Sequence, residues 1–162
     1  MTSKTVVIGI GNPFRNDDGI GPAVAARIEE QRLAGVRVVI SDGEPAGLLE
    51  AWDGADLAVV VDAIQMVPAP PGSIHRLTAG QLETGGTAAS SHGFGVPDAW
   101  RLGQALGRLP RRIVIFAVEA ADTGAGTELS PPAAAALPEV VAAVMAELTP
   151  AGTAPPGDVG LS

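Results

Sequence analysis

Short apolar segments alternate with helical patterns along this chain, and this alternation predicts an α/β fold. Continuous apolar runs bounded by turn residues are typical of parallel strands covered on both faces. A fifth strand, short and antiparallel, is expected at one edge of the sheet because too few residues precede it for a helical crossover. The four buried strands are predicted at residues 5–10, 36–40, 57–61 and 112–118, and the edge strand at residues 73–77.

Helical periodicity fills the segments between these strands. Ile20, Val24 and Ile28 recur every four residues, which predicts a helix from about residue 19 to residue 33. Residues 78–91 are rich in Gly, Thr and Ser and are expected to form a mobile loop, and residues 150–162 a disordered tail. Residues 1–149 therefore form one predicted α/β domain. Its further helices are expected at residues 48–52, 96–107 and 131–148.

Composition narrows the classes of partner. The 162 residues carry a net charge of −8, which disfavours nucleic acid and an anionic membrane surface as binding partners. The chain has no cysteine, which excludes disulfides, thiolate metal sites and a thiol nucleophile and is compatible with a reducing cytosol. The N-terminal segment lacks the pattern of a signal peptide, and no apolar run approaches the roughly 18 residues of a membrane span. We therefore expect a soluble cytoplasmic protein.

Polar side chains collect where the predicted strands end. In open α/β sheets, ligands bind at the carboxyl ends of the parallel strands. The segment Ser90-Ser91-His92-Gly93, just before a predicted helix, belongs to the same region. We therefore expect several carboxylates and one imidazole at one edge of the sheet. The carboxylates that follow strands are Asp17, Asp18, Asp42, Glu44, Asp62 and Glu119.

A dinucleotide site is a weak alternative for this edge. Gly9 and Gly11 follow the first strand, but Phe14 stands where the fingerprint needs a third small residue. Asp42 follows Gly11 by more than the roughly 20 residues expected of a ribose-binding acid. Two adjacent carboxylates, Asp17 and Asp18, would also repel a pyrophosphate. The sequence therefore favours a different ligand.

Each candidate residue also has a purely structural interpretation. Asp17 or Asp18 could cap a helix, although two neighbouring carboxylates repel unless a cation or a shared proton relieves them. Asp62 could accept hydrogen bonds from neighbouring loop amides, and His92 could be a hydrogen-bonded loop histidine. His75 is interpreted as solvated surface, and Glu119 could orient a loop or pair with an arginine.

Together, Asp18, Asp62 and His92 offer two oxygens and one nitrogen from three segments. Such a set suits a borderline divalent ion such as nickel or zinc, with coordination positions left open. No His-Glu-x-x-His pair and no Gly-x-Ser-x-Gly elbow occurs in the chain. Any hydrolysis is therefore left to carboxylates, histidine and metal.

Four motifs resemble those of the hydrogenase maturation proteases, which are nickel-dependent endopeptidases. They come in the same order as in that family and at similar spacing. The later segment 118–131 and the closing helix also resemble the family, so the resemblance covers residues 5–148. The family loop after the second strand often reads Asp-Gly-Gly-Thr, whereas this chain has Asp-Gly-Glu-Pro, which bears on which precursor is recognised. The motifs are GIGNPFRNDDGIG at 9–21, SDGEPAG at 41–47, VVVDA at 59–63 and SSHGFG at 90–95.

The resemblance implies a three-layer α/β/α sandwich of the phosphorylase/hydrolase-like type, with a five-stranded, mostly parallel mixed sheet. It implies that Asp18, Asp62 and His92 are both metal ligands and catalytic residues. It further implies an endopeptidase whose substrate is the nickel-loaded precursor of a [NiFe]-hydrogenase large subunit and whose product lacks the C-terminal extension. We expect a monomer, because the action of a single domain needs no dimer. Nickel is expected to be carried by the precursor, although zinc or another divalent ion could occupy the site. The expected substrate contacts are Gly11, Asn12, Asp17, Asp42 and Gly43.

Two other functions are compatible with the same residues. A nickel-precursor recognition module or chaperone would keep the three ligands and bind without cleaving. A carboxylate-based hydrolase of small substrates is the second alternative. Only the protease requires a substrate with a removable tail.

Overall fold

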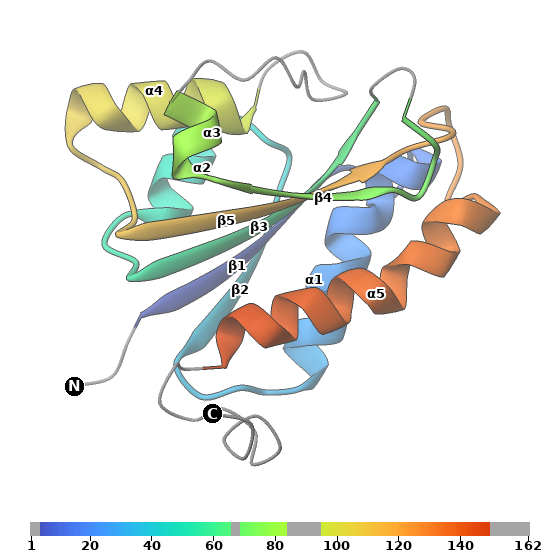
Figure 1. Ribbon diagram of the computed structural model, residues 1–162, viewed down its shortest axis with the longest axis horizontal. Coiled ribbons are helices and arrows are strands. Elements are labelled where there is room, and N and C mark those ends of the chain that lie inside the picture. Colours follow the sequence, from blue (N-terminus) through green and yellow to red (C-terminus); the bar gives the residue numbers. More distant parts are fainter. Residues whose placement is uncertain (1–3, 66–68, 84–94, 150–162) are drawn as a thin grey trace.

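The computed structural model describes residues 4–65, 69–83 and 95–149 and has a five-stranded sheet between two helical layers (Figure 1). The strand order is β2-β1-β3-β5-β4, and all neighbours are parallel except β4 and β5. The fold class predicted from the sequence is thus confirmed. The strands are β1 (Thr5–Ile10), β2 (Val36–Ser41), β3 (Leu57–Ile64), β4 (Ile74–Thr78) and β5 (Arg112–Glu119). The helices are the 3-10 helix η1 (Asn16–Gly19), α1 (Ile20–Glu30), α2 (Pro45–Trp52), α3 (Ala79–Glu83), α4 (Val96–Leu106) and α5 (Pro131–Leu148).

The two faces of the sheet have separate apolar cores. Helices α1 and α5 cover one face, and α2, α3 and α4 cover the other (Figure 1). Because side chains alternate along a strand, Ala58 and Val60 of β3 face α2 and α4, while Val59 and Val61 face α1 and α5. Every residue of β3 is buried, as expected for a central strand covered on both sides.

Several predicted boundaries are wrong. Strand β3 continues through Ala63 and Ile64, so Asp62 lies inside the strand, where its register partner on β5 is Ala117. Helix α1 ends at Glu30, three residues before its predicted end, and a turn follows in which Arg32 has a φ of 50°. Helix α2 begins at Pro45, which suits a first helical turn because proline has no N–H to leave unpaired.

The predicted loop at residues 78–91 is also wrong for its first part. The described part contains the short helix α3, which follows directly on β4. The side chain of Gln81 accepts hydrogen bonds from the backbone N–H and the hydroxyl of Thr78 at 2.7 Å. This local contact closes the first turn in a segment whose glycine content had favoured a loop. The remainder of that segment and the predicted tail at 150–162 lie outside the described residues.

The strand order creates a switch point between β1 and β3. From β1 the chain moves outward to β2 on one side, and then to β3 on the other side. In open α/β sheets, the connections at such a point diverge and leave a crevice at the carboxyl edge. Asp18 follows β1 and Asp62 lies near the end of β3, so the topology brings both carboxylates to the switch point.

The start of α1 lies unusually close to the sheet beside this switch point. A Cβ added at Gly21 would overlap the carbonyl oxygen of Ile10 and lie 2.7 Å from that of Val61. Likewise, a Cβ at Gly9 would overlap the carbonyl oxygen of Gly21. These two glycines therefore let the helix approach the ends of β1 and β3, which positions η1 and Asp18.

Gly21→Ala is expected to lower the free energy of unfolding by about 2–3 kcal/mol, because backbone must move to admit the methyl group. The matched control is Gly47→Ala in α2, where nothing lies within 4 Å of the added Cβ. The control should be neutral or slightly stabilising, since alanine favours helix. Urea unfolding of both variants checks this, and equal stabilities would contradict the close approach.

Helix α5 is long and apolar enough, by length and composition alone, to cross a membrane. It is not an uninterrupted apolar run, because Glu139 and Glu147 lie within it, and one such helix is weak evidence for a membrane span. In this structure the helix contacts α1 and β5, and it buries one apolar side against the core. The buried residues are Ala133, Ala136, Val140 and Val144. This packing is that of the core helix of an α/β sandwich.

Candidate active site at the carboxyl edge of the sheet

Asp18 is held in a tight loop that follows β1. Its carboxylate Oδ2 accepts a hydrogen bond of 2.8 Å from the backbone N–H of Asn12. The backbone of Gly11, with a φ of 147°, packs so closely on the Asp18 carbonyl that a Cβ there would overlap it. The Asp18 side chain is 1% exposed. The glycine and the carboxylate thus fix this loop together.

Asp62 reaches the same region from β3. It shares a sheet face with Ala58 and Val60, and its side chain is buried. The 3-10 helix η1, which carries Asp18, contacts β3. An ionised carboxylate in such a position is costly without compensating charge or hydrogen bonds. The topology thus places two buried acids at the β1/β3 switch point.

The third predicted ligand, His92, lies outside the described residues, so the complete set of three is not tested. No group of three His, Cys, Asp or Glu side chains within residues 4–65, 69–83 and 95–149 could hold a metal ion. The two acids nevertheless match the preference of divalent cations for carboxylate oxygens. Two oxygen donors fit an ion that brings other ligands with it, such as one already bound to a substrate protein.

Asp17, the neighbour of Asp18, has a structural role in the described part of the chain. Oδ2 accepts hydrogen bonds from the N–H groups of Ala121 and Asp122 at 2.7 and 3.1 Å and from the Ser130 hydroxyl at 2.7 Å. Oδ1 accepts a fourth, of 2.6 Å, from the Ser130 N–H. The carboxylate therefore clamps the loop that leads from β5 to α5. This corrects the helix-cap alternative, since neither η1 nor α1 has a side-chain cap, while the substrate contact of Asp17 stays a prediction.

The clamp also sets the ionisation of Asp17. Burial opposes the charged form and acts to raise the pKa of the carboxyl, but the hydrogen bonds from Ser130, Ala121 and Asp122 outweigh it and lower the pKa below the ordinary 3.8. A carboxyl whose pKa is lower in the folded protein than in the unfolded chain stabilises the fold above the unfolded value. That stabilisation is lost as the pH falls through the folded value.

The stability difference between wild type and Asp17→Asn should therefore depend on pH. It should be constant from pH 7 to about 5 and shrink below the unfolded pKa of about 3.8, because the unfolded wild-type chain takes up a proton at Asp17 at a higher pH than the folded protein does. Denaturant unfolding of both proteins at several pH values measures it. A difference that stays the same down to pH 3 would contradict an ionised clamp.

The other predicted substrate contacts divide into two kinds. Gly11 is buried against backbone. Gly43 is buried with a φ of 90°, and its N–H donates a hydrogen bond of 3.0 Å to the Ser41 hydroxyl oxygen. Asn12 and Asp42 are exposed at the edge. The Asp42 carboxylate accepts one hydrogen bond of 3.0 Å, from the N–H of Glu44. The two glycines thus shape the loops, and the substrate contacts of all four residues stay a prediction.

A histidine–glutamate pair was missed at the sequence level. His75 Nε2 lies 3.0 Å from Oε2 of Glu119, which is 2% exposed. The His75 side chain is therefore only partly solvated, with 36% of it exposed, and it is a partner of Glu119 that the sequence did not suggest. Both residues lie on the sheet face that carries Asp62. Their separation of 44 positions along the chain left no local signal.

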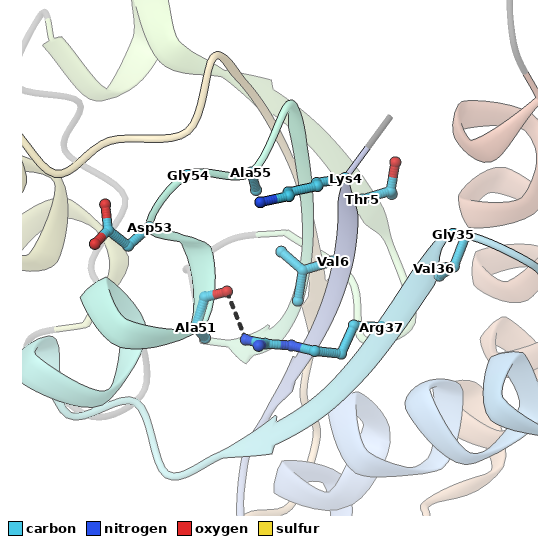
Figure 2. Close-up of a pocket in the computed structure, with 10 residues that line it drawn as sticks. All are labelled: Lys4, Thr5, Val6, Gly35, Val36, Arg37, Ala51, Asp53, Gly54 and Ala55. Atoms are coloured by element: carbon cyan, nitrogen blue, oxygen red, sulfur yellow. Dashed lines mark hydrogen bonds between the residues drawn. The ribbon is translucent and has the colours of Figure 1, made fainter. Parts of the chain in front are cut away.

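A cavity of about 470 Å³ lies at the opposite, amino edge of the sheet. Figure 2 shows Lys4 and Val6 of the β1 segment facing it, with Arg37 of β2 donating a hydrogen bond of 2.9 Å to the Ala51 carbonyl. Its walls are mainly apolar, and Asp53 is its one acidic residue. The cavity therefore lies away from the carboxylates of the switch point and lacks their chemistry.

Known structures share this architecture. The hydrogenase maturating endopeptidase HybD from Escherichia coli superposes with a TM-score of 0.72 at 21% identity, over 89% of this chain and 93% of that one. The [NiFe] hydrogenase maturation protease HycI from Thermococcus kodakarensis KOD1 gives 0.65 at 25% identity, over 88% and 90% of the two chains. The class defined by the fold is thus that of the α/β sandwiches to which these two endopeptidase structures belong.

Sequence comparison gives the family itself. The family model described as HycI, hydrogenase maturation protease, matches residues 5–147. The hydrogenase expression/formation protein HupD of Thiocapsa roseopersicina is 27% identical over 120 residues, which is 72% of this chain. The match spans 54% of HupD, so this chain covers about half the length of that relative. The chain belongs to the hydrogenase maturation protease family.

Proposed function

We propose that this protein is an endopeptidase that removes the C-terminal extension of a nickel-loaded [NiFe]-hydrogenase large-subunit precursor. The observation that carries the proposal is the placement of two buried carboxylates, Asp18 and Asp62, at the β1/β3 switch point of a chain in this family. The acidic balance and the absence of cysteine support action in the cytoplasm on a protein substrate. A single domain suffices for this chemistry, so we propose a monomer.

In this proposal the nickel is part of the substrate. Asp18 and Asp62, with His92, supply oxygen and nitrogen ligands to the nickel that the precursor already holds. A divalent ion near the scissile bond polarises its carbonyl and lowers the pKa of a water. A carboxylate or the His92 imidazole accepts the proton of the attacking water.

This arrangement makes metal occupancy a checkpoint. The described edge offers carboxylates but no thiolate, because the chain has no cysteine. Carboxylates bind divalent cations, so in this proposal the nickel of the precursor adds ligand bonds to Asp18 and Asp62 that a nickel-free precursor lacks. A precursor without nickel would therefore dock poorly, and cleavage would follow nickel insertion.

The test compares nickel-loaded and nickel-free forms of one precursor, incubated with the wild-type protein and followed by gel electrophoresis. The expected result is cleavage of the loaded form only. A precursor that lacks the extension serves as the control and should keep its length. A stable complex with the loaded precursor and no cleavage would contradict the protease and favour a recognition module.

A further inference from the structure

Two loops beside the acid site are bonded into one rigid unit. Asn16, at a φ of 46°, donates its backbone N–H to the Gly126 carbonyl at 2.9 Å, and its side chain bonds Asp122 at 3.1 Å. The Asp17 N–H bonds the Asp122 carbonyl at 2.8 Å, in addition to the Asp17 clamp. The loop of residues 11–19 is therefore fixed against residues 120–130 by backbone and side-chain contacts.

Phe14 stands out from this rigid unit. Its N–H donates to Asn12 Oδ1 and its carbonyl accepts from the Gly126 N–H, both at 2.9 Å, yet its side chain is 69% exposed. Aromatic residues make up only 3% of the chain, and Phe116 is buried in the core. A single exposed apolar residue is ordinary by itself. Here, however, hydrogen bonds fix both the N–H and the carbonyl of Phe14, and Phe14 precedes Asp18 by four residues.

A hollow next to Phe14 extends the apolar surface. A cavity of about 390 Å³ lies between the start of α1 and the 120–130 loop. Its walls include the rings of Pro13 and Pro22 and the side chains of Ala23 and Leu129. Pro13, which lines the hollow, directly precedes Phe14 in the chain, and we call Phe14 and the hollow together the Phe14 patch.

The charges around the Phe14 patch are mostly negative. Asp122 and Glu128 are exposed on the loop that is bonded to residues 11–19 through Asn16. Arg15 is the nearby cation, and its Nε donates to the Thr123 carbonyl at 3.1 Å. The surroundings therefore disfavour a second copy of this acidic chain and an anionic membrane, and they complement a basic partner.

We propose that the Phe14 patch docks a polypeptide segment of the protein substrate that carries a large apolar side chain with basic residues beside it. The proposal rests on the proposed function for the identity of that substrate. A rigid aromatic anchor loses little conformational entropy on binding and is the kind of residue that dominates interface energies. The patch lies outside the acid pair, so it holds the precursor without contacting the nickel or the scissile bond.

The test measures the Kd of the nickel-loaded precursor for wild type, Phe14→Ala and Leu106→Ala, with the thermal melting of each variant as a folding check. Leu106 is the matched control, because it is 56% exposed at the end of α4, which leads into β5 at the amino edge. We expect Phe14→Ala to weaken binding about tenfold or more while kcat changes less than twofold, and Leu106→Ala to leave Kd within twofold. An unchanged Kd for Phe14→Ala, or equal losses in both variants, would overturn the Phe14 patch.

A salt titration tests the basic character of the docked segment. The wild-type Kd should rise as NaCl increases from about 50 to about 500 mM, because attraction between exposed charges is screened. A Kd that stays constant or falls would overturn the basic partner. Binding and cleavage are read separately: a precursor that binds through Phe14 but keeps its extension would refute the protease while leaving the docking surface intact.

Discussion

Asp62→Asn is expected to lower the rate of precursor cleavage about 10³-fold. The amide keeps the shape of the buried side chain but removes its charge, so it neither holds a cation nor accepts a proton as a carboxylate does. Loss of a positioned acid–base group typically costs two to four orders of magnitude. Cleavage under single-turnover conditions, with a nickel-loaded precursor, measures the effect without a contribution from product release.

Asp53→Asn is the matched control for Asp62→Asn. Asp53 is exposed at the amino edge of the sheet, where its carboxylate accepts a hydrogen bond of 3.2 Å from the Arg108 guanidinium. Exposed ion pairs contribute about 1 kcal/mol or less, so the control should fold and cleave like wild type. Equal rates for wild type and Asp62→Asn would remove Asp62 from the site.

Asp17→Ala is expected to lower the free energy of unfolding by about 3–4 kcal/mol. The variant loses the four hydrogen bonds that its carboxylate accepts from Ala121, Asp122 and Ser130. Each hydrogen bond to a charged group contributes about 1.5–3 kcal/mol, and the contributions of one network are not additive. For a chain of this size the melting temperature should fall by roughly 10 °C.

Asp42→Ala is the control for this stability effect. The Asp42 carboxylate is exposed and accepts a single hydrogen bond, from the Glu44 N–H, so its loss should cost about 1 kcal/mol or less. Calorimetric or urea unfolding compares the two variants. If Asp17→Ala were no less stable than Asp42→Ala, the clamp on the 120–130 loop would be contradicted.

The sequence predicts the sheet well because its strands are marked by local composition. β1 was predicted at its observed bounds, and α5 likewise, since apolar runs and helical periodicity are properties of neighbouring residues. The end of β3 was predicted too early because an acid within an apolar run looks like a boundary. In the structure the ladder with β5 continues for two residues past Asp62.

The partners of the site residues were beyond the reach of local patterns. Asp17 and Asp18 are adjacent in sequence and equal in chemistry, yet one bonds residues more than 100 positions away and the other bonds Asn12. Nothing in the motif distinguishes Asp17, which clamps the 120–130 loop, from Asp18, the predicted metal ligand. The distinction depends on where the 120–130 loop packs, and that loop is far away in the sequence. The pair of His75 and Glu119 depends in the same way on the antiparallel pairing of β4 with β5.

The central claim is the removal of a C-terminal extension, and the intact mass of the precursor tests it most directly. A nickel-loaded large-subunit precursor is incubated with the wild-type protein and, in parallel, with Asp62→Ala. We predict that wild type alone reduces the mass of the precursor by one defined C-terminal peptide. An unchanged mass for a cognate precursor of verified nickel content would contradict the account.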